Sequence, residues 1–197
     1  GLSNIYEIKS TIDFITSENS IYKAPNMICI LQCTSMYPIH NSDANLNVIN
    51  TFKNTFNRPV GYSDHTLGNK ALIYASVLGS SVLEFHFTDD RKGKTFRDHK
   101  ISLNPKETVE LIKNIKKIKN ILGRGTKLPI KREITSKHIK TFRRSIYAKK
   151  FIQKGKKISE DDLTVLRPNT GLDSRKFYDL IGKKIKRNTK PFEKIKI

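Results

Sequence analysis

Apolar residues in the first part of the chain change from a helical spacing to a continuous run. Isoleucines recur every three or four residues from Ile5 to Ile15, which predicts an amphipathic helix with Ser3 as its N-cap. The segment 27–33 is apolar almost throughout, as expected for a strand that is buried on both faces. The first two predicted elements are therefore a helix and a strand.

The alternation of helix and strand continues to about residue 124. We expect a helix over 45–56, a strand leading into Ser63, a helix over 71–78, a strand over 81–86 and a long helix over 105–122. Asn104 is the expected N-cap of the long helix, with proline at its first position and Glu107 at its third, and Gly123 closes it. Strands that alternate with helices in this way predict an α/β fold with right-handed connections.

Three strands alone make an open sheet whose faces are poorly covered. We therefore expect this part of the chain to belong to a barrel that other strands complete. The chain also starts with Gly1 rather than Met, inside a predicted junction between loop and helix, and we expect further residues upstream.

The character of the sequence changes after Gly125. Lys and Arg dominate as far as Arg144 without helical periodicity, and short strand-like pieces separated by turns follow. One piece is a strand over 146–148, and Ser159 is expected to cap a helical turn. The predicted organisation is a first domain over 1–124, a basic linker over 125–143 and a smaller second domain over 144–197.

The chain is strongly basic, with 38 Lys and Arg against 18 Asp and Glu and a formal net charge of +20. Nucleic acid or an anionic membrane could be the partner, but solvated helix faces and a basic linker explain the charge without any polyanion. The wide scatter of the basic residues favours this second interpretation. No segment resembles a secretory leader or a run of about 20 apolar residues, so we expect a cytoplasmic protein without a membrane partner.

Cys29 and Cys33 are the only cysteines. Their even separation within an apolar run places both on one face of the predicted strand, where they would act as small core hydrophobes. Neither a disulfide framework nor a cysteine-based zinc site is expected.

Polar side chains gather where each predicted strand ends, in the strings CTSMYP, GYSDHT and LEFHFT. Parallel α/β sheets and barrels carry their active sites on these loops, because the carboxyl ends of the strands meet at one edge. His65 and His86 follow two successive strands at equivalent positions. A lone histidine is more often structural, but the paired placement favours a shared role as ligands.

The chain resembles the sialic acid synthase (N-acetylneuraminate synthase) family over almost its whole length. The resemblance rests on six strings that occur in the family's order and spacing, namely CTSMYP, GYSDHTLG, LEFHFT, RDHKISLNP, RRSIYAKKFIQKGKKIS and DDLTVLRPNTG. It implies an α/β fold class, with the last three strands of a TIM (β/α)8 barrel followed by a small antifreeze-like (SAF, β-clip) domain.

The resemblance also implies a metal site and a binding site for phosphoenolpyruvate. His65 and His86 match the two histidines that hold the catalytic divalent ion, most often Mn²⁺, with Mg²⁺ or Co²⁺ as alternatives. Ser63 matches a residue that hydrogen-bonds phosphoenolpyruvate. Ser35 stands where some members have Asn and faces the same substrate.

Three further residues match family positions that contact the sugar. Tyr37 matches a tyrosine that lines both substrate pockets and is counted with the histidines as catalytic. Asp98 matches an aspartate that accepts hydrogen bonds from sugar hydroxyls, and Arg167 matches an arginine that reaches the barrel of the other subunit and contacts the sugar's acyl-amino group. A homodimer is therefore implied.

Three other polar residues near these strings receive no catalytic role. Glu84 lies two residues before His86 on the same strand face and could orient a ligand, but its role stays open. Asp64 and His99 are interpreted as structural.

The implied reaction joins phosphoenolpyruvate to an N-acylated amino sugar such as N-acetylmannosamine, giving a nine-carbon 2-keto acid and phosphate. This is C–C bond-forming transferase chemistry (EC 2.5.1 type) of cell-surface carbohydrate biosynthesis. The family's catalytic glutamate and phosphate-binding lysines lie on the first five barrel strands, which have no match here, so activity is expected only with that half present.

A different class of function stays open: a non-catalytic remnant that binds carbohydrate or nucleic acid. Mn²⁺ binding that is lost in His65→Ala or His86→Ala would favour the synthase, and steeply salt-dependent binding to a polyanion would favour nucleic acid. The sequence does not distinguish a sialic, legionaminic or pseudaminic acid precursor as the sugar.

Overall fold

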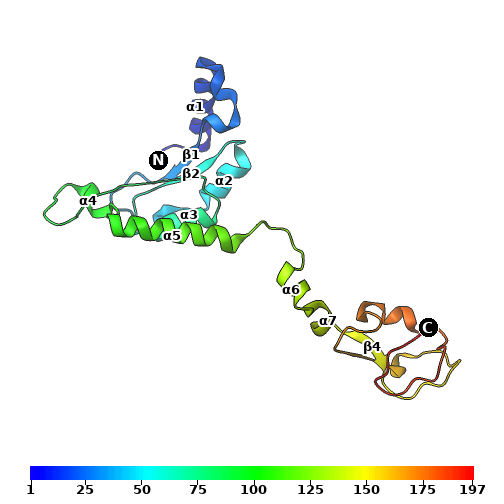
Figure 1. The fold of residues 1–197 in the computed structure, drawn as a ribbon. Helices are drawn as coiled ribbons and strands as arrows, with labels where there is room; N and C mark the ends of the chain where they lie inside the picture. Colours follow the sequence, from blue (N-terminus) through cyan, green and yellow to red (C-terminus); the bar gives the residue numbers. More distant parts are fainter. The chain divides into compact units, whose positions relative to one another are not determined.

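Three parallel strands, β1 (Ile30–Cys33), β2 (Val60–Asp64) and β3 (Val82–Phe85), form a sheet in the order β1-β2-β3. They belong to a computed structural model that describes residues 1–197 and divides into two units, Gly1–Gly125 and Thr126–Ile197 (Figure 1). The sheet lies in the first unit. Its parallel strands agree with the α/β pattern predicted from the sequence.

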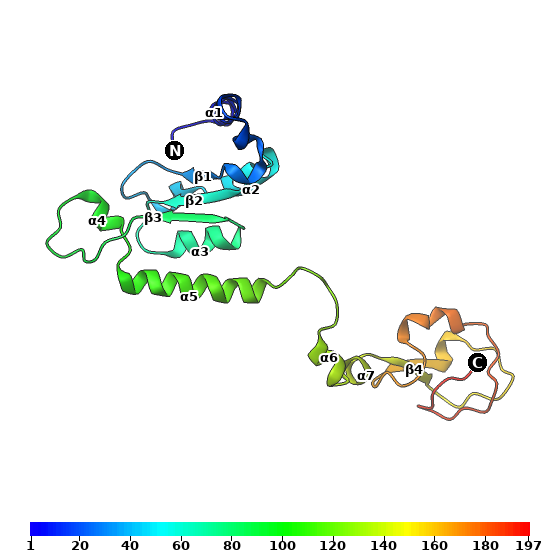
Figure 2. The same cartoon turned by 45° about the horizontal axis from the view of Figure 1, so that its top comes forward.

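Three helices cover one face of the sheet, and the first two of them connect its strands. They are α2 (Val48–Thr55), α3 (Lys70–Val77) and α5 (Pro105–Leu122), and Figure 2 shows α3 between β3 and α5. The buried core contains residues from this face and from the helices, including Ile30, Tyr62, Ile49, Phe52, Leu72 and Leu111. Side chains alternate along a strand, so the residues next to Tyr62 point to the opposite face.

The opposite face of the sheet has no helix from this unit. Val82 is 43% exposed there, and Glu84 is also exposed. Gly61 allows the strands to pack closely on this face, because a Cβ at this position would lie 2.6 Å from the carbonyl oxygen of Val82. The exposed face agrees with the expectation that three strands alone leave the sheet poorly covered.

The ends of the helices follow local capping chemistry. In α1 (Ile5–Glu18) the N-cap is Asn4, so the prediction of Ser3 is wrong by one residue. The Asn4 side chain accepts a hydrogen bond from the Glu7 amide at 3.1 Å, and the Glu7 carboxylate accepts one from the Asn4 amide at 2.7 Å. The same capping box, predicted from the sequence, opens α5 at Asn104.

Several predicted boundaries differ from the observed ones. β1 starts at Ile30, because Pro25–Met27 forms a turn of 3-10 helix, so Cys29 lies before the strand. α2 starts at Val48 and not at Asn45, whose left-handed backbone (φ 44°) interrupts a helix. A short helix that was not predicted, α4 (Arg97–Ile101), places Asp98 in its first turn and not in a loop.

The second unit starts with two short helices, α6 (Lys131–Thr135) and α7 (His138–Phe142). They lie inside the predicted linker, where no helix was expected. Strand β4 (Ser145–Ala148) then pairs antiparallel with β5 (Leu163–Leu166), and the predicted capped turn at Ser159 forms the 3-10 helix Glu160–Asp162.

The core of the second unit is separate from that of the first and consists mainly of aliphatic side chains. Its buried residues are Ile146, Ala148, Ile152, Ile158, Leu163, Leu180, Ile185 and Ile195. The second unit also has 3-10 turns at Ser174–Lys176 and Tyr178–Leu180, and the first unit has such turns at Ser20–Lys23 and Asn41–Ala44. No helix of the structure is both long and apolar enough to cross a membrane.

Candidate active site

Two histidines and a tyrosine converge at the carboxyl end of the sheet. His65 directly follows β2 and His86 directly follows β3, and their ring centroids lie 5.2 Å apart. Tyr37, in the loop after β1, lies 4.0 Å from the His65 ring and 5.7 Å from the His86 ring, centroid to centroid. The structure thus brings together the three residues that the sequence predicted as catalytic.

His65 is held in one orientation by the backbone of the neighbouring loop. Its side chain is buried, with 4% exposed, and Nδ1 lies 2.8 Å from the carbonyl oxygen of Thr34. A carbonyl only accepts hydrogen bonds, so this contact requires the proton on Nδ1 and leaves the lone pair on Nε2. The Sγ atom of Cys33 lies 4.0 Å from the same Nδ1.

His86 is more open to solvent than His65, with 32% of its side chain exposed. Its Nδ1 lies 3.6 Å from Oδ2 of Asp98, so a carboxylate faces the same ring nitrogen that faces a carbonyl in His65. Metal-bound histidines commonly present one ring nitrogen to a carboxylate or carbonyl and bind the ion with the other. The surroundings of both imidazoles fit that arrangement.

The separation of the two rings also fits a single ion. A metal ion bound about 2.1 Å from a ring nitrogen lies a little over 3 Å from the ring centroid, so two imidazoles at a wide angle have centroids about 5 Å apart. The observed distance is 5.2 Å. The structure holds no group of three or more His, Cys, Asp or Glu side chains arranged as metal ligands.

Asp98 carries a carboxylate oxygen that is not paired inside the protein. Its Oδ1 is buried and has no hydrogen-bond partner, and the nearest cation, Nε of Arg97, is 3.6 Å away. Buried carboxylate oxygens normally accept hydrogen bonds. This oxygen is therefore an unused hydrogen-bond acceptor next to the histidine pair.

Arg97 and Cys33 belong to this cluster but were not predicted as part of the site. The guanidinium carbon of Arg97 lies 4.7 Å from the centroid of the Tyr37 ring, a cation–π contact. Arg97 is adjacent to Asp98 in the sequence, and Cys33 is the last residue of β1. The only sign in the sequence that either residue belongs to the site is its position next to predicted site residues. Their contacts depend on the tertiary structure.

Ser63 is tied to a carboxylate. Its Oγ donates a 2.7 Å hydrogen bond to Oε1 of Glu84, its register partner on β3. A hydroxyl has one proton, so Ser63 can donate to a ligand only if its hydrogen bond to Glu84 breaks first. Ser35 is exposed and lies beside Gly1.

Asp64 and His99, interpreted from the sequence as structural, make contacts inside the protein. The Asp64 carboxylate accepts hydrogen bonds from the Tyr62 hydroxyl at 3.0 Å and from the amide of Thr66 at 2.8 Å. Burial, together with the charge of Asp64, raises the pKa of Tyr62 well above its usual value. Nδ1 of His99 lies 2.9 Å from the Thr88 hydroxyl.

Arg167 lies in the second unit, directly after β5. Its guanidinium carbon is 5.6 Å from the centroid of the Phe142 ring, and its side chain is exposed.

Comparison with known proteins assigns both units. A family model described as the NeuB family matches residues 1–127, and a SAF domain model matches residues 143–191. This chain belongs to the NeuB family. The resemblance to sialic acid synthases and the predicted fold class, part of a barrel followed by an antifreeze-like domain, are thereby confirmed.

Several of the similar proteins are named as synthases of sialic-acid type. The N,N'-diacetyllegionaminic acid synthase of Campylobacter jejuni is 37% identical over 196 residues, which cover 100% of this chain and 57% of that protein. The human N-acetylneuraminate-9-phosphate synthase is 37% identical over 165 residues, 82% of this chain and 44% of that protein. This chain thus spans about half the length of the curated relatives it matches.

A solved structure supports the same assignment. The N-acetylneuraminic acid (sialic acid) synthetase of Leptospira borgpetersenii, a complex with citrate, has a TM-score of 0.61 and 33% sequence identity. The match covers 70% of this chain and 46% of that one.

Proposed function

We propose that this chain carries the metal-binding part of an enzyme that condenses phosphoenolpyruvate with an N-acylated amino sugar. The products are a nine-carbon 2-keto acid of sialic-acid type and phosphate. The observation that supports the proposal best is the pair of imidazoles, 5.2 Å apart at the carboxyl end of the sheet, each with Nδ1 facing an oxygen. The names of the relatives support the product class.

His65 and His86 would hold a divalent ion through their Nε2 atoms, and we propose Mn²⁺, with Mg²⁺ or Co²⁺ as alternatives. Two imidazole donors leave several positions for oxygen ligands, which suits these ions better than the closed tetrahedral sites of structural zinc. When bound, such an ion polarises the aldehyde oxygen of the open-chain sugar as a Lewis acid.

The neighbouring side chains would position the two substrates. The free Oδ1 of Asp98 would accept a hydrogen bond from a sugar hydroxyl. Tyr37, which lies against both imidazole rings, would form a wall between the substrates and exclude water. Ser63 and Ser35 would donate to oxygens of phosphoenolpyruvate, Ser63 after exchange of its bond to Glu84.

We further propose that the active form needs more protein than this chain contains. The chain spans about half of its relatives, and one face of its sheet is uncovered by its own helices, as in a barrel that other strands complete. In a homodimer, Arg167 would contact the acyl-amino group of the sugar held by the other subunit.

Titration with Mn²⁺ tests the central claim. Unbound Mn²⁺ gives a strong electron paramagnetic resonance signal that falls as the protein takes up the ion. We expect His65→Ala and His86→Ala each to weaken binding at least tenfold, because each removes one of two protein ligands. His138→Ala, the same change in the second unit, should leave the affinity unchanged. Binding that survives both site substitutions would refute the metal site.

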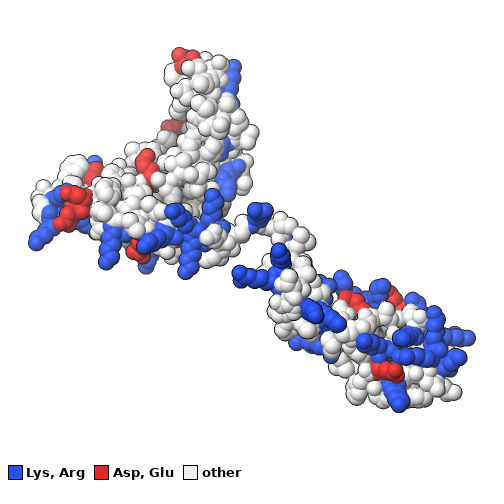
Figure 3. All heavy atoms as spheres, in the orientation of Figure 1, with Lys and Arg blue, Asp and Glu red and all other residues white.

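A second candidate function, binding of a polyanion, rests on the distribution of charge. Residues 126–197 carry 22 Lys and Arg against 7 Asp and Glu, and Figure 3 shows basic side chains crowding the surface of this unit. An affinity for a mixed-sequence DNA duplex that falls steeply as the salt concentration rises, and that His65→Ala does not change, would favour this function.

A further inference from the structure

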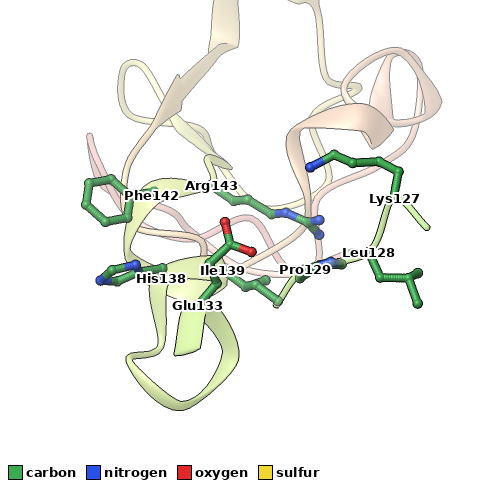
Figure 4. A pocket seen from close by; sticks show the side chains of 8 residues that line it. All are labelled: Lys127, Leu128, Pro129, Glu133, His138, Ile139, Phe142 and Arg143. Atoms are coloured by element: carbon green, nitrogen blue, oxygen red, sulfur yellow. The ribbon is translucent and has the colours of Figure 1, made fainter. Parts of the chain in front are cut away.

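Four arginines of the second unit line one hollow. Arg143, Arg144, Arg167 and Arg175 surround a space of about 420 Å³, together with Phe142, Asp173 and Ser174. Arg143 and Phe142 also line a neighbouring hollow against α6 and α7, shown in Figure 4. The segments that carry the four arginines are far apart in the sequence, so the fold itself brings these positive charges together.

The single carboxylate of this hollow is already occupied. The Arg175 guanidinium donates to Asp173 twice, from Nε to Oδ1 at 2.8 Å and from Nη2 to Oδ2 at 3.1 Å. These hydrogen bonds, with a smaller contribution from the charge of Arg143, hold the pKa of Asp173 well below its usual value. Asp173 is therefore ionised at neutral pH, and Arg175 is the guanidinium to which it is hydrogen-bonded.

The other three guanidinium groups have no anionic partner. Arg143, Arg144 and Arg167 take part in no salt bridge, and the one side-chain contact recorded among them is that of Arg167 with the Phe142 ring. Three unpaired charges around one space repel one another, so the fold gains nothing from them.

Hydrogen bonds fix the backbone around the hollow. The Ser174 amide donates to the carbonyl of Arg144 at 3.2 Å, and the Asn169 amide donates to the carbonyl of Lys140 at 2.7 Å. The hydroxyl of Tyr147 donates to the carbonyl of Pro168, next to Arg167, at 2.6 Å. The two segments that carry the unpaired arginines, and the third segment that carries Arg175, are thus tied to one another before any ligand binds.

We propose that this hollow binds the phosphate monoester group of a small ligand. A guanidinium fork matches two oxygens of a phosphate, and the three terminal oxygens of a monoester can accept from several forks at once. A phosphate dianion also compensates more of the three excess charges than a single carboxylate does. Arg143, Arg144 and Arg175 have no role in the proposed synthase site, whereas Arg167 would serve both, because we also propose that it contacts the sugar of the other subunit in a homodimer. Binding at the hollow itself needs neither the metal ion nor the other barrel strands.

Calorimetric titration of the full chain at fixed ionic strength tests the proposal. We expect glucose 6-phosphate to bind more tightly than inorganic phosphate if the site accepts a monoester, and unphosphorylated glucose not to bind. The double variant Arg143→Gln with Arg144→Gln should weaken glucose 6-phosphate binding at least tenfold, a loss of about 1.4 kcal/mol or more.

A matched control separates this site from the general charge of the unit. Lys183→Gln with Lys184→Gln removes the same charge from exposed positions outside the hollow and should change the affinity less than twofold. Equal losses in the two double variants, or no loss in the arginine variant, would overturn the proposal in favour of a diffuse polyanion surface. So would binding of inorganic phosphate alone, since the site would then not recognise a monoester.

A conservative variant keeps the test valid if the glutamine variant does not fold. Arg143→Lys with Arg144→Lys retains the charge but not the fork, and it should also bind at least tenfold more weakly. His65→Ala should bind glucose 6-phosphate as the parent does, and the arginine variants should bind Mn²⁺ as the parent does. Failure of the histidine site and failure of the arginine site would therefore give different results.

Discussion

The buried carboxylate of Asp162 provides a sharp test of what stabilises the second unit. Its side chain is 0% exposed and accepts hydrogen bonds from Nζ of Lys156 at 2.6 Å, from the Ser159 amide at 3.0 Å and from the Ser159 hydroxyl at 2.9 Å. Asp162→Ala removes all three bonds and leaves an amide and a hydroxyl without their acceptor.

The expected cost follows from the groups that lose a partner. Loss of the capping interaction at Ser159 costs about 1 kcal/mol. Loss of the charge-assisted bond to Lys156 costs about 2 kcal/mol, near the lower end for such bonds because the lysine is 43% exposed and regains water. The sum, about 3 kcal/mol, corresponds to a fall in Tm of roughly 12–24 °C for a unit of this size.

Hydrogen exchange of peptides from 145–166, followed during thermal unfolding, measures this change in the second unit alone. Asp161→Ala is the matched control, because Asp161 is exposed and its side chain makes no hydrogen bond, and it should cost about 0.5 kcal/mol or less, a shift in Tm of less than about 4 °C. If the two variants have the same Tm, the hydrogen bonds of Asp162 do not stabilise the unit and the reasoning is refuted.

The same carboxylate predicts a dependence on pH. Burial raises the pKa of Asp162, but the hydrogen bonds from Lys156 and Ser159 outweigh burial and hold the pKa well below its usual value. The folded unit therefore binds a proton less readily than the unfolded chain. Its stabilising contribution is complete above about pH 4 and is lost as the pH falls toward the lowered pKa. Asp162→Asn should flatten this acid limb of the stability curve.

Two further predictions concern the first unit. Gly61→Ala should destabilise it by about 1–3 kcal/mol in urea unfolding, because the new Cβ would meet the Val82 carbonyl oxygen at 2.6 Å, and an unchanged midpoint would contradict the close packing. Asp98→Asn should weaken Mn²⁺ binding about tenfold without loss of circular dichroism, because a carboxylate facing a metal-binding imidazole raises its basicity. Asp13→Asn, on the exposed side of α1, is its control, and equal affinities in the two variants would exclude a supporting role for Asp98.

Local patterns in the sequence predicted the elements that local chemistry determines. The capping box at Asn104 and Glu107 fixes the start of α5, and isoleucines at helical spacing define α1. The placement of His65 and His86 was also predictable, because parallel strands bring the residues that follow them to one edge.

Features that depend on distant contacts could not be predicted in this way. α6 and α7 have five residues each, too short for an apolar period to show. The hydrogen bond from Ser63 to Glu84 depends on the register of β2 and β3, which no local signal sets. The cation–π contact of Arg97 with Tyr37 depends on the positions of α4 and of the loop after β1, which are far apart in the sequence.

The hydrogen bond between Nδ1 of His65 and the Thr34 carbonyl fixes the imidazole ring when the chain folds, before any ion binds. The entropy of fixing this ring is spent during folding, so capture of an ion does not have to supply it again. A chelator should accordingly strip the proposed ion, where it has bound, and leave the loop after β1 in place. Binding and release of the proposed ion would then take place at a site that is already folded, and would not be coupled to a folding transition.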